Sequence, residues 1–390
     1  MVRDSLPMRI AIVTESFLPT INGVTNSVLR ILEHLGDQGH TATVIAPENS
    51  HGPTQYQGHS IARVPALPLQ SISKVGLPLG IPSRRLETAI TRFNPDLVHL
   101  ASPFILGGAA ARIAKKMAIP CLSVYQTDLA GFAKHYGLSA AGSGLQKLVG
   151  KIHRNSDRTL VPSFSAMSEL HDAGVTNTHL WRRGVNTNLF TPQAKDSDLR
   201  QRWFSRSSGT AKILVGYVGR IANEKRLVDL KVIDQNPDFQ LIITGDGPAR
   251  SRIEKELPNA IFTGYQFGIE LAKIYASLDI FVHPGPHETF CQSVQEALAS
   301  GVPCIVPKTG GPAELVINGE TGFIIDTGNP ESLLGSLNRF VLRRDRTSMS
   351  EAARDSVSKR TWPTIMNELM DHYSDLIENT PSKKMGARSA

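Results

Sequence analysis

Short apolar runs alternate with amphipathic stretches along the first half of the chain. Continuous apolar runs such as Ile10 to Val13 are typical of parallel strands that are buried on both faces. Between the runs, apolar residues recur at the spacing of one helical face, as from Val24 to Leu35. Because strands that alternate with helices build parallel sheets, this half predicts a doubly wound α/β domain. The predicted strands are residues 9–14, 41–46, 97–100 and 120–124, and the predicted helices are residues 24–35 and 107–117.

The same alternation restarts in the second half, after the polar segment Ser205 to Thr210, which we interpret as a linker. An amphipathic segment from Trp362 to Ile377 follows the last strand, and we expect it to pack back on the first domain. The sequence thus predicts an α/β protein of two Rossmann-like, doubly wound domains that face each other across a cleft. Ligands of such sheets bind beyond the carboxyl ends of the strands, so the cleft is the expected site of function. The second set of predicted strands is residues 212–218, 239–244, 280–283 and 303–307, and the predicted domains are residues 1–200, 201–361 and, for the returning helix and tail, 362–390.

Length and composition agree with a two-domain globular protein. The 390 residues are about twice what one compact domain holds. With 41% hydrophobic and 20% charged residues, the composition excludes a disordered chain or a fibre. No apolar run approaches the roughly 18 residues that span a bilayer, so a transmembrane protein is not expected. The first seven residues lack an apolar stretch and the three cysteines are scattered, so we expect a protein of the reducing cytoplasm.

All of the excess positive charge lies in the first half. Residues 1–190 contain 18 Lys and Arg against 11 Asp and Glu, whereas residues 191–390 contain 24 of each, which accounts for the formal net charge of +7. Such asymmetry favours an anionic partner, namely an acidic substrate, an acidic membrane surface or nucleic acid, although solubility alone would also explain it. Nucleic acid is disfavoured because aromatic residues make up only 6% of the chain and are not interleaved with basic ones.

A basic loop follows the predicted strand 212–218. The segment GRIANEKR places Arg220 and Lys225 just beyond the carboxyl end of that strand, with a helix expected close behind. A guanidinium fork, an ammonium group and free backbone N–H groups together suit a diphosphate. Taken alone, the two cations would more simply form an exposed basic turn.

Two glutamates flank the predicted start of a helix. The sequence Pro-Gly-Pro at 284–286 forces a loop, so a helix is expected to begin near Phe290 or Cys291. Glu288 precedes that start, and Glu296 lies one to two turns inside the helix. The N–H groups of a helix N-terminus attract phosphate oxygens, and carboxylates beside it can accept hydrogen bonds from sugar or ribose hydroxyls. Singly, Glu288 could be a helix cap and Glu296 a solvated surface residue.

Glycine turns follow three further predicted strands, at Gly23, at Gly245 to Pro248 and at Gly310 to Gly311. None of them matches the GxGxxG dinucleotide fingerprint. One such turn is weak evidence, but five loops of this kind at strand ends, with cations and acids between them, predict a nucleotide-diphosphate ligand.

Together and in this order, the motifs resemble the retaining GT-B glycosyltransferases of family four. The resemblance extends over nearly the whole chain. The opening TESFLPTINGVTNSV and the stretch YQTDLAGFAKHYG favour the branch of actinobacterial GDP-mannose-dependent α-mannosyltransferases that act on glycolipids. The remaining matching segments are GRIANEK, GDGP, HETFCQSVQEA, SGVPCIVPKTGGPAELV, NGETGFI and the domain-joining stretch WRRGVNTNLFTP.

The resemblance implies a role for each matching residue. Arg220 and Lys225 would bind the donor diphosphate, and Glu288 would hold hydroxyls of the transferred sugar. Glu296 would bind the ribose. Gly23 would lie near the phosphates, and Tyr265 and Gln266 near the base. The implied donor-binding residues are Gly23, Gly245, Tyr265, Gln266, Phe290, Cys291 and Glu296. The implied catalytic residues are Arg220, Lys225, Glu288 and Asp128.

The sequence departs from the family pattern at two positions. Cys291 stands where the family usually has glycine, which should narrow the space beside the donor. Gln126 stands where many members have histidine, and an amide cannot act as a base near neutral pH. A retaining mechanism of the internal-return type, in which the leaving phosphate takes the acceptor proton, tolerates this change. Asp128 could orient a sugar or acceptor hydroxyl or could be a helix N-cap.

No metal site is predicted. Asp196-Ser197-Asp198 matches a DxD pattern, but it lies in a polar stretch and not at a strand end, so we interpret it as chance. No histidine pair has convincing zinc spacing with a third ligand. The resemblance therefore implies a donor substrate, GDP-mannose, with no cofactor and no required metal, because cations and helix ends can do the same electrostatic work.

A separate basic cluster suggests a membrane surface as partner. Positions 147, 151, 154 and 158 have the spacing of a helical stripe, with apolar residues beside it. A basic face next to an apolar one suits docking on anionic lipid, although a helix packed on its own domain has the same pattern. The cluster consists of Lys147, Lys151, His153, Arg154 and Arg158.

The sequence thus predicts a retaining hexosyltransferase. The transferred sugar is expected to be mannose from GDP-mannose, and the acceptor a glycolipid of the glucuronosyl diacylglycerol or phosphatidylinositol mannoside type. Two alternatives stay open: a nucleotide-sugar 2-epimerase of the same architecture, and a catalytically silent lipid-binding protein. The expected location is the cytoplasm, at the inner face of the plasma membrane if the lipid surface is a partner.

Overall fold

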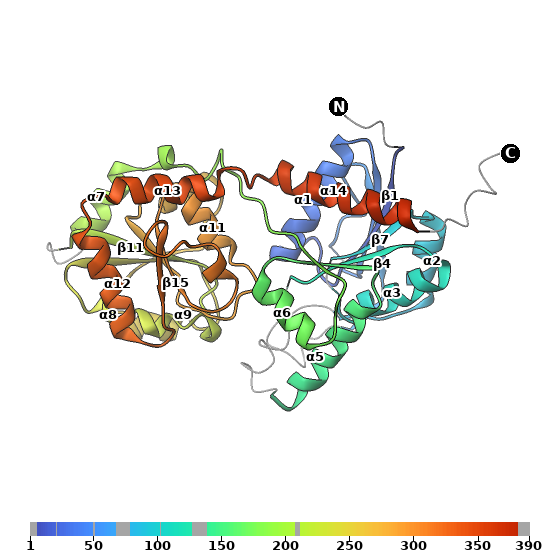
Figure 1. The fold of residues 1–390 in the computed structure, drawn as a ribbon, viewed down its shortest axis with the longest axis horizontal. Coiled ribbons are helices and arrows are strands. Elements are labelled where there is room, and N and C mark those ends of the chain that lie inside the picture. Colours follow the sequence, from blue (N-terminus) through green and yellow to red (C-terminus); the bar gives the residue numbers. More distant parts are fainter. Residues whose placement is uncertain are drawn as a thin grey trace.

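The structure is a computed structural model that describes residues 6–20, 22–49, 51–67, 79–101, 103–126, 139–206 and 211–380. Two large sheets lie side by side, each with helices on both faces, and they form two domains (Figure 1). The predicted α/β class is confirmed.

The first domain is built on a sheet of eight strands. Its elements are, in chain order, β1 (Arg9–Val13), α1 (Gly23–Asp37), β2 (Thr41–Pro47), β3 (Gln55–Tyr56), β4 (His59–Val64), β5 (Ala66–Leu67), β6 (Leu79–Gly80), α2 (Arg84–Phe93), β7 (Leu97–Leu100), α3 (Ile105–Met117), β8 (Cys121–Val124), α5 (Ser139–Arg154), β9 (Arg158–Val161), α6 (Phe164–Asp172) and β10 (Thr178–Leu180).

The strand order of this sheet is β10-β9-β8-β7-β1-β2-β4-β3, and all pairs are parallel except β3 with β4. Alternate residues of each strand enter different cores, as expected for a sheet buried on both faces. On one face, Ile12 of β1 packs with residues of α1 and of the last helix of the chain. On the other face, Val13 packs with residues of α2 and α3.

The second domain is built on a parallel sheet of six strands in the order β13-β12-β11-β14-β15-β16. Its elements are η2 (Pro192–Ala194), α7 (Ser197–Arg206), β11 (Ile213–Val218), η3 (Asn223–Lys225), η4 (Leu227–Leu230), α8 (Lys231–Asp234), β12 (Phe239–Thr244), α9 (Arg250–Glu256), β13 (Ile261–Gly264), α10 (Gly268–Ser277), β14 (Ile280–Val282), α11 (Gln292–Ala299), β15 (Cys304–Pro307), η5 (Gly311–Glu314), β16 (Gly322–Ile325), α12 (Pro330–Leu342) and α13 (Arg346–Ser358). The last helix of the chain, α14 (Trp362–Asn379), follows this domain in sequence.

This sheet also separates two cores. Leu214 of β11 belongs to the core that includes residues of α7, α10, α11 and α13, whereas Val215 belongs to the core beneath α8, α9 and α12. The continuous apolar run of β11 is therefore explained by burial on both faces, as in the first domain.

The chain crosses between the domains twice. Trp181 packs in the core of the first domain, but Val185 and Trp203 pack in that of the second. The boundary expected at residue 200 therefore falls inside α7, and Ser205 and Arg206 of the expected linker belong to this helix; residues 207–210 lie outside the described part. The reason is that α7 carries Trp203, which a linker would not bury.

On the return, the backbone at Val185 pairs with that at Thr361, and α14 then lies along α1 of the first domain (Figure 1). Its buried residues Leu369 and Tyr373 join the core of that domain, and the Tyr373 hydroxyl is 2.7 Å from Nδ1 of His99. The expected return of the C-terminal helix is confirmed. None of the described helices is both long enough and apolar enough to cross a membrane.

Candidate functional site

Two loops that follow neighbouring strands of the second sheet meet at the centre of the candidate site. β11 leads into Lys225 and β14 into Glu288, and the Lys225 ammonium donates a hydrogen bond to the Glu288 carboxylate. Because β11 and β14 pair in parallel, their carboxyl ends lie at the same edge of the sheet. Gly285 permits the close approach, since a Cβ there would lie 3.1 Å from the Lys225 Cα. The structure thus joins a cation and an acid that are 63 residues apart in sequence.

A third residue of this group, His283, was not singled out by the sequence. It follows β14 directly, is buried, and places Nε2 3.5 Å from Glu288 Oε1. Its ring stacks on that of Tyr217, with the centroids 6.0 Å apart. The only signal for it in the sequence is a histidine at a strand end, a pattern that many buried histidines share.

The electrostatics of this group hold Glu288 ionised. Burial by itself raises the pKa of Glu288, but the close His283 ring and the positive Lys225 outweigh it and lower the pKa to about 2. Burial lowers the pKa of His283, and Cys291 together with Glu288 reverses this and raises it to about 9. At neutral pH, Glu288 is therefore a carboxylate that can accept hydrogen bonds from ligand hydroxyls.

Arg220 lies in the same loop as Lys225, but it has a different partner. Its guanidinium pairs with Glu224, whose side chain is 8% exposed, while 43% of the Arg220 side chain is exposed. The Tyr217 hydroxyl donates a hydrogen bond to the Arg220 carbonyl at 3.0 Å. Behind this loop the chain forms the 3-10 turns η3 and η4 and then the short helix α8, and it turns between η3 and η4 at Arg226, whose φ is +54°. The loop therefore offers side-chain cations rather than a helix N-terminus.

Glu296 lies inside α11, which begins at Gln292, one or two residues after the predicted start. The Tyr275 hydroxyl donates a hydrogen bond to Glu296 Oε2 at 3.1 Å. Burial raises the pKa of Glu296 to about 7, and hydrogen bonds from Tyr275 and Gln292 only partly oppose this. The alternative of Glu296 as a solvated surface residue is therefore wrong.

Cys291 occupies a backbone conformation that suits glycine. It is the residue before α11, it is 6% exposed, and its φ of +82° with ψ of +79° lies outside the regions that L-residues favour. Its Sγ is 3.4 Å from the Ser293 hydroxyl oxygen. Phe290, beside it, is buried, and a Cβ on Gly311 would lie 2.5 Å from the Phe290 Cα, so the loop after β15 also reaches this point.

A half-buried arginine, Arg183, from the segment that crosses between the domains joins the two domains at the site. The Arg183 guanidinium donates a hydrogen bond to the side-chain oxygen of Gln126, and the Thr289 hydroxyl donates one to the Gln126 carbonyl at 3.1 Å. Burial lowers the pKa of Arg183 to about 10, and Glu288 opposes this. A Cβ on Gly23 would lie 3.7 Å from Arg183 Nη1, so Gly23 is at the same place. Arg183 was not predicted as a site residue, although it lies in the domain-joining WRRGVN stretch.

A second contact between the domains is made by Glu314, which also was not predicted. Its carboxylate accepts hydrogen bonds from the backbone N–H groups of Phe164 at 2.9 Å and Ser165 at 2.8 Å. These groups lie at the N-terminus of α6, where a negative charge is favourable. Arg182 lies 3.8 Å from the same carboxylate. The loops after the strands of both sheets therefore face each other.

The predicted base-contacting residues lie at the far end of the same sheet edge. The Gly245 N–H donates to the Gly264 carbonyl at 2.8 Å, so the loops after β12 and β13 are adjacent. Tyr265 is 69% exposed, and Gln266 donates a side-chain hydrogen bond to the Thr263 carbonyl. The predicted residue Asp128 lies outside the described residues.

Comparison with known proteins identifies the family. Residues 21–189 match the model for Glycosyltransferase Family 4, and residues 200–356 match that for Glycosyl transferases group 1. The chain is 44% identical over 377 residues to the GDP-mannose-dependent alpha-mannosyltransferase of Corynebacterium glutamicum, covering 95% of this chain and 90% of that protein. The chain is a family 4 glycosyltransferase.

Two further matches support the family and the fold of this glycosyltransferase. Alpha-monoglucosyldiacylglycerol synthase of Acholeplasma laidlawii is 28% identical over 85% of this chain and 91% of that protein. The solved structure of sucrose-phosphate synthase from Thermosynechococcus elongatus superposes with a TM-score of 0.79 at 20% identity, covering 95% of this chain and 99% of that chain. The predicted GT-B fold and the family resemblance are confirmed.

The predicted basic cluster of this glycosyltransferase is only partly at the surface. Lys147 and Lys151 are exposed on α5, and Leu148 beside them is 39% exposed. His153, however, is buried, with Nδ1 2.9 Å from the Ser123 hydroxyl oxygen. Arg158 lies beyond the end of α5, in β9, where it pairs with Asp375 of α14. The predicted cluster fails at these two positions because His153 faces the sheet and the helix ends at Arg154.

Asp196, the first residue of the DxD pattern that we interpreted as chance, is a helix cap. Its Oδ1 accepts a hydrogen bond from the Leu199 N–H at 2.9 Å, and Lys273 lies 4.0 Å away. The carboxylate is therefore committed to starting α7.

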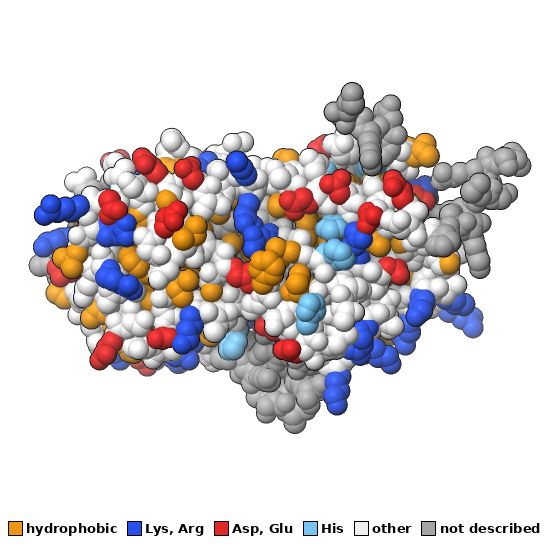
Figure 2. Space-filling model, in the orientation of Figure 1, with side chains coloured by type: hydrophobic (Ala, Val, Ile, Leu, Met, Phe, Trp, Pro, Cys, Tyr) orange, Lys and Arg blue, Asp and Glu red, His pale blue; other side chains and the backbone are white. Residues whose placement is uncertain are grey.

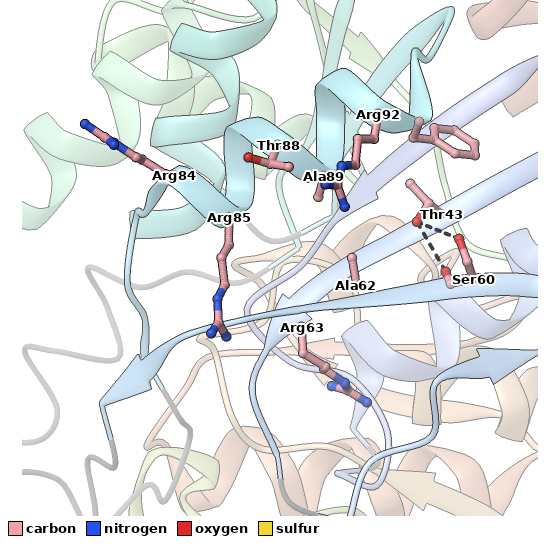
Figure 3. Close-up of a pocket in the computed structure, with 10 residues that line it drawn as sticks. Thr43, Ser60, Ala62, Arg63, Arg84, Arg85, Thr88, Ala89 and Arg92 are labelled. Carbon is pink, nitrogen blue, oxygen red and sulfur yellow. Dashed lines mark hydrogen bonds between the residues drawn. The ribbon is translucent and has the colours of Figure 1, made fainter.

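A groove of about 570 Å³ lies between α2 and the strands β2 and β4 of the first domain (Figure 3). Arg85 and Arg92 reach from α2 along it, Arg84 points away from the strands, and Arg63 instead donates to the carbonyls of Leu18 and Pro53. None of the predicted donor-binding residues lines this groove. On the face seen in Figure 2, Lys and Arg side chains gather along the adjacent edge of the first domain, in agreement with its excess positive charge.

With Glu296 on the ribose, as the family resemblance implies, its raised pKa predicts how donor affinity depends on pH. A carboxylate accepts hydrogen bonds from ribose hydroxyls, and protonation removes much of this capacity. Because the pKa is about 7, the ionised fraction falls below that pH, and we expect the Kd for GDP-mannose to rise roughly tenfold from pH 8 to pH 6. Calorimetric titrations across this range test it. In Glu296→Gln the dependence should vanish; an equal slope in both proteins would exclude Glu296 as the titrating group.

The strained backbone at Cys291 predicts a difference between two substitutions. Alanine keeps the Cβ that disfavours φ of +82°, whereas glycine removes it. Cys291→Gly should therefore be more stable than Cys291→Ala by about 1 kcal/mol in urea unfolding. Since both variants lose the same sulfur, equal stabilities would show that the backbone here is not strained.

Proposed function

We propose that this glycosyltransferase transfers a mannosyl group from GDP-mannose to a hydroxyl of a glycolipid, with retention of configuration at the anomeric carbon. The observation that carries the proposal is the Lys225–Glu288 pair, with Arg220 in the same loop, at strand ends next to the contact between the domains. The choice of donor follows from the 44% identity to the C. glutamicum protein, whose name specifies GDP-mannose.

In this proposal the two cations act on the leaving group. As the bond between the anomeric carbon and the phosphate oxygen breaks, Arg220 and Lys225 stabilise the negative charge that develops on the diphosphate of GDP. The acceptor oxygen then bonds to the anomeric carbon on the same face, and its proton passes to the departing phosphate oxygen. No side-chain base is needed, which agrees with a glutamine at position 126. We infer that no metal ion is required, since these side chains supply the positive charge.

The remaining residues would orient the donor and acceptor. Glu288 would accept hydrogen bonds from hydroxyls of the mannosyl group, and Glu296 from those of the ribose. Tyr265 and Gln266 would contact the base. We propose that Asp128, a residue of the first domain, orients a hydroxyl of the acceptor.

The acceptor class is inferred from one relative and from charge. The A. laidlawii protein is named as the synthase of a glucosyl diacylglycerol, and that product is a glycolipid. The first half of the chain, with its net positive charge, would meet the anionic headgroup or the surface in which it lies. We propose a glucuronosyl diacylglycerol or a phosphatidylinositol mannoside as acceptor, reached by peripheral binding at the cytoplasmic face of the plasma membrane.

Release of GDP from GDP-mannose, measured with and without added lipid, tests the function. The proposal predicts GDP release that depends on the lipid acceptor and a mannosylated lipid as product. A 2-epimerase would convert the sugar nucleotide without any acceptor, and a silent binding protein would release no GDP. UDP-glucose serves as the competing donor, and faster turnover with it would overturn the choice of GDP-mannose.

Membrane binding is tested separately, by sedimentation with vesicles that contain acidic lipid. Each Lys near an anionic surface contributes about 1 kcal/mol, so reversing Lys147 and Lys151 to Glu should weaken binding at least about tenfold. Arg154 is left unchanged because it donates a hydrogen bond to the Ala173 carbonyl. The matched control reverses Lys212 and Lys255, which are exposed on the second domain. Unchanged binding in the α5 variant would remove α5 as the docking face.

A further inference from the structure

The proposed donor site contains three side chains that could bind one metal ion. Among the described residues, one group of at least three His, Cys, Asp or Glu side chains can offer ligand atoms to a single ion: His283, Glu288 and Cys291, whose atoms all lie within 4.8 Å of one another. Imidazole, thiolate and carboxylate are the three ligand types that Zn²⁺ prefers in proteins. His283 and Cys291 are buried, so the site is shielded from water.

A second, independent observation points to a ligand at this place. His283 is 2% exposed, and neither of its ring nitrogens has a hydrogen-bond partner at normal distance and angle among the described residues; Nε2 has only the 3.5 Å contact with Glu288. Buried ring nitrogens without partners are costly, so they usually face a water, an ion or a ligand. The ring forms an ion-pair contact with Glu288, whose Oε1 lies 3.5 Å from Nε2. That separation is close to the spacing of two ligands on one tetrahedral zinc ion, roughly 3.3–3.8 Å from bond lengths of about 2.0–2.3 Å.

From this arrangement we propose that His283, Glu288 and Cys291 bind Zn²⁺ in the absence of donor, and that the bound ion excludes the nucleotide sugar. Zinc binding displaces one proton from the Cys291 thiol and one from the His283 ring, both to water or buffer, so that a thiolate and a neutral ring nitrogen bind the ion and a water takes the fourth position. The ion binds the Glu288 carboxylate in place of Lys225. It thereby breaks the Lys225–Glu288 pair, on which donor binding depends in the proposed function. Zinc is thus an inhibitor at this site and not a cofactor.

The surrounding charges set the strength of the site. The thiolate and the carboxylate together balance the charge of the ion, but Lys225 and Arg183 are positive and near Glu288. They oppose the ion, so affinity should be lower than at a closed structural zinc site and a chelator should remove it. The same two cations favour the diphosphate, so donor and zinc should compete.

Metal binding is measured first, on the full chain without donor. The proposal predicts one Zn²⁺ per chain by competition with a chromogenic chelator, and a thiolate-to-metal charge-transfer band when Co²⁺ replaces zinc. The band should disappear in Cys291→Gly, whose backbone suits glycine, and in His283→Asn. It should persist in Cys121→Ser, a control that removes a buried thiol of the first domain. No binding, or an unchanged band in Cys291→Gly, would overturn the site.

Competition with substrate is measured second, and it depends on the proposed function. GDP-mannose should displace Co²⁺ and abolish the band, and zinc should inhibit mannosyl transfer until chelator is added. For each variant, half inhibition is defined as half of its own rate without metal. The zinc concentration that gives half inhibition should rise at least tenfold in Cys291→Gly and stay the same in Cys121→Ser. If the cobalt band forms and responds to Cys291→Gly but GDP-mannose leaves it unchanged, the donor assignment fails while the metal site stands.

Discussion

Replacing Arg220 or Lys225 by alanine is expected to lower kcat for mannosyl transfer at least about 100-fold. In the proposed function each side chain stabilises charge on the leaving diphosphate, and the loss of one preorganised contact of this kind costs about 10²–10³ in rate. The effect should fall on kcat more than on KM, because the charge is larger in the transition state than in the bound donor. Steady-state kinetics with GDP-mannose and lipid acceptor measure it.

Lys231→Ala is the control for this pair of variants. Lys231 lies in α8, a few residues further along, and its ammonium is 3.3 Å from Glu256 at the exposed surface. Its loss should leave turnover unchanged. If the alanine variants at positions 220 and 225 are as active as this control, neither cation acts on the leaving group.

Replacing Glu288 by alanine is expected to have an effect of the same size on turnover, together with a loss of stability. The carboxylate is the partner of Lys225, and its removal leaves a partly buried ammonium without an acceptor, which costs about 3 kcal/mol or more. In the proposed function the transferred sugar also loses the group that accepts its hydroxyl hydrogen bonds. Turnover should fall at least about 100-fold at a temperature where circular dichroism shows the variant folded.

Glu288→Gln separates the two effects. The amide keeps the shape and one acceptor oxygen but not the charge, so its turnover should lie between those of Glu288→Ala and the wild type. His287→Ala, at the exposed neighbouring position, is the control and should retain full turnover. Wild-type turnover in Glu288→Ala would mean that the sugar does not bind against this residue.

The sheets and the centre of the site were accessible from the sequence because both depend on local patterns. Apolar runs mark strands buried on both faces, and the carboxyl ends of neighbouring parallel strands must meet at one edge. Lys225 and Glu288 follow strands β11 and β14, so their meeting follows from topology once the strands are assigned.

The residues that were missed depend on contacts between distant segments. Arg183 reaches Gln126, and Glu314 caps α6, only because the two crossing segments set the domains against each other. No local pattern encodes that arrangement. His153 shows the opposite error: its place near a basic stripe suggested the surface, but the side chain faces Ser123 in the sheet.

A crystal structure of the protein with GDP-mannose tests the central claim most directly. The account predicts diphosphate oxygens within hydrogen-bonding distance of Arg220 and Lys225, with mannose hydroxyls on Glu288 and ribose hydroxyls on Glu296. A donor bound elsewhere, for example in the groove beside α2, or bound without contact to these four side chains, would contradict it.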